Sequence, residues 1–229
     1  KSRPLGIAGN FHIVAFNKAT LSAHTNGNIL AQELVAGSNQ FGSSGFDSLE
    51  MNYINDYSGV STNTIDASSM SLQILGLGDT NTVGTTGTGA SAKFTVNGTT
   101  LDHAQQIYQD ASSSFHYIDL AAVRADMLRL SNTLSTYSDS GVTRTGSNFT
   151  GTNYNEGDGD WYYKTTDGVV NVLNIDSSNQ TILTKKLHLS LKTNTTLIIN
   201  VDAGSVTNLQ IPATYYVYNG TQYNSHEIK

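Results

Sequence analysis

Hydrophobic residues in the first third of the chain occur in short runs that are separated by turn-forming residues. Residues 11–16 and 29–35 are two such runs, and Asn-Gly and Gly-Ser pairs lie close to them. Short apolar runs bounded by Gly, Asn and Ser are typical of β-strands joined by tight turns. The same pattern continues through residues 54–77. Residues 76–92 are instead rich in Gly and Thr, and we expect them to form an exposed loop.

A helical pattern is clear in the middle of the chain. Apolar residues spaced alternately by three and four positions share one face of an α-helix; they are Leu120, Val123, Met127, Leu130, Leu134 and Tyr137. We predict a long helix over about residues 118–138. Asp119 lies near its start, where a negative charge interacts favourably with the helix dipole. A weaker stripe predicts a short preceding helix, formed by Ala104, Ile107, Tyr108 and Ala111 with Asp102 as its N-cap. Packing against a core explains both stripes.

The last third of the chain returns to strand-like patterns. Residues 169–175, 187–191 and 197–201 are apolar or alternate between apolar and polar positions. We find no repeat of fixed length, so a coil of strands here would have to be irregular. The sequence therefore predicts a mostly β fold with one major helix. Its 229 residues fit a single domain with one core, so we expect one domain over residues 1–229, and an incomplete C-terminal end of that domain stays open.

The composition indicates an exported protein. Only 13% of residues are charged, and Ser, Thr, Asn and Gly supply most of the polar surface. The net charge is −6 and basic residues are scattered, which argues against nucleic acid or an anionic membrane as partner. The absence of cysteine excludes disulfides and thiolate metal sites. No apolar stretch is long enough to span a bilayer, so we expect any signal sequence and anchor to lie outside this sequence.

The sequence lacks the common catalytic motifs. We find no nucleophile elbow, phosphate-cradling loop or zinc-binding helix, and the six histidines have no ligand-like spacing. A pair of carboxylates of the kind that glycosidases use stays open as an alternative, since Asp47, Glu50, Asp56 and Asp66 are available. Any fold brings some carboxylates together, so this carries little weight. We expect a binding protein and no enzyme.

An acidic and aromatic segment at residues 154–163 is the strongest candidate site. Glu156, Asp158 and Asp160 alternate with small residues, and carboxylates in such a turn can converge on Ca²⁺. The spacing differs from the EF-hand loop. The neighbouring rings offer flat faces for sugars; they are Tyr154, Trp161, Tyr162 and Tyr163. The alternative is a polar turn whose tryptophan packs inward, without metal or any other cofactor.

A second aromatic cluster lies near the end of the chain. Strand alternation places Tyr216 and Tyr218 on one face, and tyrosine provides contact area at a low entropic cost, as in many binding loops. Packing within a sheet explains the same pattern. We treat both residues as candidate ligand-binding positions.

Three segments, in this order, resemble one family of bacterial surface proteins. The first is PLGIAGNF at residues 4–11 followed by TNGNILA at residues 25–31; the second is the predicted helix; the third is VNVLNID at residues 170–176 leading into TLIINV at residues 196–201. Together they resemble the choice-of-anchor A family, whose members are adhesive domains known mainly from Gram-positive bacteria. The chain departs from the family pattern at Asn26-Gly27-Asn28, where relatives usually have an acidic-Gly-Arg turn.

The resemblance implies an irregular right-handed β-solenoid with the long helix packed along its side. It further implies the ligand-binding head of an adhesin, anchored to the cell wall through regions outside this sequence. We expect a monomer whose partner is a host or cell-surface glycan, or a matrix protein. An ice-binding-like module, a structural stalk and a carbohydrate-active enzyme are the alternatives. Ice binding would need a regular threonine array, and the Thr pairs at 62/64, 80/82 and 193/195 keep no common period.

Overall fold

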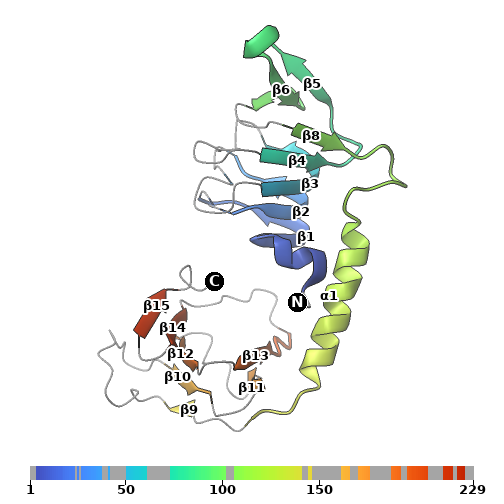
Figure 1. The fold of residues 1–229 in the computed structure, drawn as a ribbon. Helices are drawn as coiled ribbons and strands as arrows, with labels where there is room; N and C mark the ends of the chain where they lie inside the picture. The colour runs from blue at the N-terminus through green and yellow to red at the C-terminus, as the bar shows by residue number, and fades with distance from the viewer. Residues whose placement is uncertain are drawn as a thin grey trace. The chain divides into compact units, whose positions relative to one another are not determined.

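The computed structural model divides the chain into two compact units, Lys1–Arg129 and Leu130–Lys229 (Figure 1). It describes residues 4–23, 25, 27–37, 41, 50–60, 73–101, 106–140, 144–145, 161–165, 170–175, 187–191, 195–205, 214–218 and 221–224. The described part is mostly β with one α-helix, as the sequence predicts. The expectation of a single domain stays a prediction.

The first unit is built on a five-stranded sheet in which all neighbours are parallel. A short 3-10 helix, η1 (Gly6–Asn10), precedes it. The strands, in sheet order, are β1 (Ile13–Thr20), β2 (Ile29–Val35), β3 (Glu50–Gly59), β4 (Gln73–Leu77) and β8 (Gln106–Gln109). Figure 1 shows β1 to β4 stacked in chain order. Each strand therefore pairs with the next one along the chain until β4.

Both faces of the sheet are buried at its central strands. Ile29, Ala31 and Ile54 belong to the core on one face, whereas Leu30 and Tyr53 belong to a second cluster on the other. Successive side chains of a strand point to opposite faces, so the continuous apolar run of β2 fits burial on both sides. The second cluster includes residues of the helix. This explains why the strands contain little of the polar alternation expected of a sheet with one wet face.

The predicted loop at residues 76–92 is wrong in its main part. The stretch contains the end of β4, then β5 (Val83–Thr86) and the short 3-10 helix η2 (Gly89–Ser91). β5 pairs antiparallel with β6 (Lys93–Val96), which pairs with β7 (Thr99–Leu101). Asn97 and Gly98 join β6 to β7 and both have positive φ, the conformation that a two-residue hairpin turn requires. Cross-strand hydrogen bonds order this segment despite its few apolar residues.

The predicted short helix before the long one is also wrong. Ile107 and Tyr108 lie in β8, which pairs in register with β4. Ile107 packs against the core of the sheet, whereas Tyr108 is 41% exposed. The spacing of these residues fits a helix and a strand equally, and pairing with the edge of an existing sheet decides between them. The predicted N-cap, Asp102, lies outside the described residues.

The long helix, α1 (Leu120–Ser135), is confirmed, with ends slightly inside the predicted range. Its residues that are not fully exposed lie on the predicted stripe; they are Leu120, Val123, Met127, Leu130 and Leu134. Asp119 Oδ1 accepts a hydrogen bond from Ala122 N at 2.9 Å, which makes Asp119 the N-cap. In the first unit, the start of α1 packs on the sheet through Leu120, Val123 and Met127. None of the helices in the described residues is long and apolar enough to cross a membrane.

The second unit contains a mixed sheet and a strand pair. The mixed sheet has the order β15 (Thr221–Asn224), β14 (Thr214–Tyr218), β12 (Leu187–Leu191), β10 (Trp161–Lys164) and β9 (Arg144–Thr145), with antiparallel pairs only at its edges. β11 (Val170–Ile175) and β13 (Thr196–Val201) form the parallel pair. Asn200 Nδ2 donates to the Leu134 carbonyl at 2.8 Å and Asn174 Nδ2 to that of Tyr137 at 3.0 Å. These amides satisfy carbonyls at the end of the helix.

Candidate functional site

A hollow of about 310 Å³ lies in the first unit. Its walls come from β2, β3, the turn after β4 and the connection between β8 and α1. The polar side chains that line it are Gln32, Asn55, Asp79, Ser113, His116 and Asp119. Pockets that bind small molecules combine apolar surface with a few polar groups, and here Tyr53, Ile118 and Leu120 supply the apolar part. We call this hollow the cleft.

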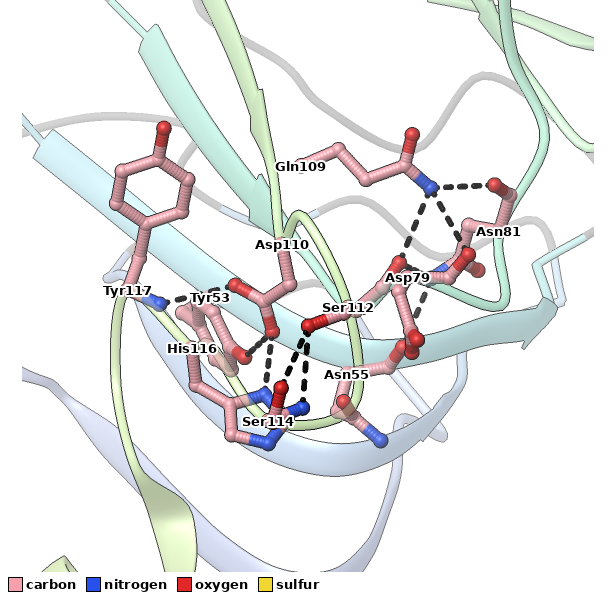
Figure 2. A network of polar contacts seen from close by, with 11 residues as sticks. Tyr53, Asn55, Asp79, Asn81, Gln109, Asp110, Ser112, Ser114, His116 and Tyr117 are labelled. Carbon is pink, nitrogen blue, oxygen red and sulfur yellow. Dashed lines mark hydrogen bonds and ion pairs between the residues drawn. The ribbon is translucent and has the colours of Figure 1, made fainter.

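The connection that forms one wall of the cleft is fixed by a buried carboxylate, Asp110 (Figure 2). Asp110 Oδ2 accepts a hydrogen bond from the Tyr53 hydroxyl at 2.5 Å and lies 2.7 Å from His116 Nδ1. Its Oδ1 accepts one from Tyr117 N at 2.9 Å. The Asp110 side chain is fully buried and 31% of the His116 side chain is exposed. A charge buried in this way is stable only because donors surround it.

The sheet register explains how Tyr53 reaches this carboxylate. Tyr53 on β3 is the register partner of Gly76 on β4, and a Cβ at Gly76 would lie 2.7 Å from Tyr53 Cδ2. The glycine therefore leaves the space that the tyrosine ring occupies. Asp110 follows β8 directly, and its N donates to the Leu77 carbonyl at 2.8 Å, which extends the pairing with β4. The hydroxyl and the carboxylate thus meet across β4.

The network changes the protonation of two groups. Burial, and after it the hydrogen bond to Asp110, raises the pKa of Tyr53 far above its usual range, so this hydroxyl stays a neutral donor. The hydrogen bond to Asp110 also raises the pKa of His116 above its ordinary value of 6.5, against an opposing effect of desolvation. A hydrogen bond with the backbone of Ser113 also raises the pKa of His116. The pairing of His116 with Asp110 thus favours the protonated imidazole and ties the connection to Asp110.

His116 should make the stability of the protein depend on pH. Because its folded-state pKa is raised, its contribution is fully present below its ordinary pKa of 6.5 and is lost as the pH rises through the raised value. We expect His116→Gln to remove this part of the dependence, as measured by urea unfolding from about pH 5 to about pH 9. The other ionisable groups facing His116 stay in the variant; they are Asp110, Tyr53, Asp79 and Asp119. Equal slopes for both proteins would contradict the assignment.

A second polar cluster holds the turn that carries Asp79 to the cleft (Figure 2). Asn81 is buried and its side chain makes four hydrogen bonds. Its Oδ1 accepts from Tyr57 N and Asn97 Nδ2, and its Nδ2 donates to the Asn55 and Gly78 carbonyls. Gln109 Nε2 donates to the carbonyls of Asn81 at 2.5 Å and Gly78 at 3.2 Å. These side chains join β3 and the turn after β4 to the β5–β7 sheet. Asp79 is thereby held at a fixed position.

Three aromatic residues form an exposed cluster, one of them on β8 and two on the connection that follows it. Tyr108, Phe115 and Tyr117 are 41%, 55% and 52% exposed. The ring of Tyr117 lies 5.5 Å from that of Tyr108 and 5.8 Å from that of Phe115, with edge-to-face geometry in both pairs. We call these three residues the aromatic cluster. Tyr117 directly follows His116 and precedes Ile118, both of which line the cleft.

The sequence pattern did not reveal this site. Tyr108 fitted a helical stripe, and Asp110 and His116 belong to no motif. The available signal was weak: an aspartate directly after a strand, three serines, and then an aromatic residue on each side of His116. Asp110 can hold the wall of the cleft because the fold brings Tyr53 of β3 within hydrogen-bond distance of it.

The residues predicted as a site lie in the second unit. Tyr154, Glu156, Asp158 and Asp160 fall outside the described residues. Trp161, Tyr162 and Tyr163 lie in β10, and Tyr216 and Tyr218 lie in β14, so the two predicted clusters belong to one sheet. Tyr163 and Tyr216 are both register partners of the buried Leu189 on β12. Ligand binding by these residues stays a prediction. Among the described residues, no cluster of His, Asp or Glu could hold a metal ion.

The comparisons with known proteins give one result. The model of a family described as "Putative Ice-binding-like adhesive domain" matches residues 4–228. No curated protein and no solved structure matches the chain.

Proposed function

This chain belongs to the family described as "Putative Ice-binding-like adhesive domain", and on this premise we propose that it is the non-catalytic, ligand-binding head of a cell-surface adhesin. Membership in an adhesive family indicates an adhesin-like role on an exposed surface. The match over residues 4–228 is the observation that carries the proposal. The ligand we propose is a glycan on a host or neighbouring cell, with a matrix protein as the alternative partner.

The cleft supports binding without catalysis. Asp110 is buried behind the wall of the cleft and bonded to the Tyr53 hydroxyl, His116 and Tyr117 N, so its role is to hold the wall in place. A catalytic acid or base must instead reach the proton that it transfers. The remaining polar groups of the cleft are amides, carboxylates and a hydroxyl, which suit hydrogen bonding to a ligand. We infer a recognition surface on a rigid scaffold.

The finer features of the proposal follow the resemblance to the choice-of-anchor A family. We propose that the parallel strands are turns of an irregular right-handed β-solenoid, which the pairing of consecutive strands β1 to β4 supports. We further propose a monomer on the surface of a Gram-positive bacterium, anchored to the cell wall through other regions of the protein. Residues 154–163 are a second proposed contact, with Ca²⁺ held by Glu156, Asp158 and Asp160.

The test is a binding survey with the whole chain. Beads coated with the chain are applied to arrays of glycans and to immobilised matrix proteins, with and without a calcium chelator. We expect saturable binding to one class of surface because a preformed recognition site selects its partner. The triple variant Asp158→Ala, Asp160→Ala and Trp161→Ala tests the second contact, and loss of binding on chelation would favour calcium there.

Two further measurements separate the alternatives. The family description also names a likeness to ice-binding domains, so inhibition of ice recrystallisation is measured in parallel. Array glycans are then analysed for cleavage products. If the chain inhibited ice recrystallisation and attached to none of the tested surfaces, ice binding would replace the adhesin proposal. Cleavage of a bound glycan would show that the chain is an enzyme.

A further inference from the structure

Resting on the proposed adhesive function, we infer that the aromatic cluster and the carboxylates of the adjoining cleft form a binding site for a neutral glycan. Tyr108, Phe115 and Tyr117 provide the faces on which a sugar ring stacks. Asp79 and Asp119 of the cleft accept hydrogen bonds from its hydroxyl groups. All of these residues belong to the first unit, whereas residues 154–163 belong to the second.

The exposure of the aromatic cluster is the first support. Single exposed apolar residues are ordinary on protein surfaces, whereas rings that contact one another and still remain about half exposed form a patch. Edge-to-face packing leaves ring faces turned in different directions, and a sugar can contact more than one of them. The polar edge of a tyrosine also allows it to border both an apolar surface and water.

The rigidity of the cluster is the second support. Tyr117 N donates to Asp110 Oδ1 and Phe115 N donates to the Ser112 carbonyl at 3.0 Å. Tyr108 lies in β8, and its hydroxyl donates to Gln106 Oε1 at 3.2 Å. Because the backbone is already fixed, little conformational entropy is lost when a ligand binds. The buried network around Asp110 thus prepares the cluster for binding.

The charge of the adjoining cleft selects the kind of ligand. Asp79 and Asp119 line the cleft next to His116, and the whole chain has a net charge of −6. Asp119 Oδ1 caps the helix, but a carboxylate can accept about four hydrogen bonds, so capacity remains. Acidic groups disfavour phosphate headgroups and sialylated or uronic sugars by like-charge repulsion. A neutral sugar, with hydroxyls to donate and an apolar ring face, fits both parts of the site.

The test uses the whole chain on an array of neutral, sialylated and uronic-acid-containing glycans. Titration with the neutral oligosaccharide of strongest signal then compares variants. We expect Tyr117→Ala and Phe115→Ala each to weaken binding by at least about tenfold, whereas Tyr117→Phe keeps the ring and most of the affinity. Tyr117→Ala retains the backbone hydrogen bond to Asp110, so it should fold, which urea unfolding checks. Tyr137→Ala is the matched control. Tyr137 is 41% exposed, as Tyr108 is, but it does not belong to the aromatic cluster.

The outcomes separate this inference from the proposed function. Equal affinity of the wild type and Tyr117→Ala for a neutral glycan would overturn the inference and leave the adhesive function standing. Binding to matrix proteins alone, or preference for anionic glycans, would do the same. Absence of binding to every surface would overturn the proposed function, and the inference with it. Loss of binding in the ring-deleting variants alone would establish the site.

Discussion

Asp110→Ala is expected to lower the free energy of unfolding by about 3–5 kcal/mol, because it leaves two donors, the Tyr53 hydroxyl and Tyr117 N, without their charged acceptor. Tyr53 is only 1% exposed, so water is a poor replacement partner for its hydroxyl. Urea unfolding measures the change. Because the wall of the cleft would lose its anchor, the same variant should also lose glycan binding.

Asp126→Ala is the matched control for this result. Asp126 lies on α1 and pairs with Arg129 at 3.1 Å, but its side chain is 65% exposed. Surface pairs of this kind contribute little, and we expect a change below about 0.5 kcal/mol. If the two variants were equally stable, Asp110 would have no special structural role, and the account of the network would be wrong.

Asn81→Ala is expected to lower the free energy of unfolding by about 2–4 kcal/mol, because three backbone groups of β3 and of the turn after β4 lose a side-chain partner. Asn81 Oδ1 accepts from Tyr57 N at 3.0 Å, and its Nδ2 donates to the carbonyls of Asn55 at 2.8 Å and Gly78 at 2.9 Å. Alanine replaces none of these bonds. The variant should also release the turn that positions Asp79, so glycan binding should weaken.

Asn132→Ala provides the comparison for Asn81. Asn132 is exposed on α1, where alanine has the higher helix propensity, so this variant should be as stable as the wild type or slightly more stable. Both variants are compared by urea unfolding and by titration with the neutral oligosaccharide. A stable Asn81→Ala protein with normal binding would mean that strand pairing alone orders the turn.

The parts of the fold that follow local rules were predictable. The apolar stripe from Leu120 to Leu134 follows from helix geometry alone. As expected, the structure leaves these residues buried or half-buried. Strands β2, β11, β12 and β13 likewise lie within about one residue of their predicted ends. The helix predicted at residues 106–109 was wrong, because their apolar spacing fits a helix and a strand equally. Pairing with the free edge of β4 selects the strand.

The candidate site was not predictable in the same way. Tyr53 and Asp110 are separated by 57 positions in the chain and meet because β3, β4 and β8 pair in parallel register. Exposure of the aromatic cluster is likewise a property of the assembled sheet. Tyr108 has a large aromatic side chain of the kind found in protein cores. The alternation of β8 nevertheless turns it outward, while Ile107 packs inward.

The sequence by itself determined the mostly β class, the position and face of the long helix, and the adhesive type of the domain. These depend on short-range spacing and on segments that keep their order along the chain. Only the tertiary structure decided the burial of Asp110, the pairing of His116 with it and the shape of the cleft. They arise from side chains of distant strands and turns, and no local pattern encodes which of these meet or which of them water can reach.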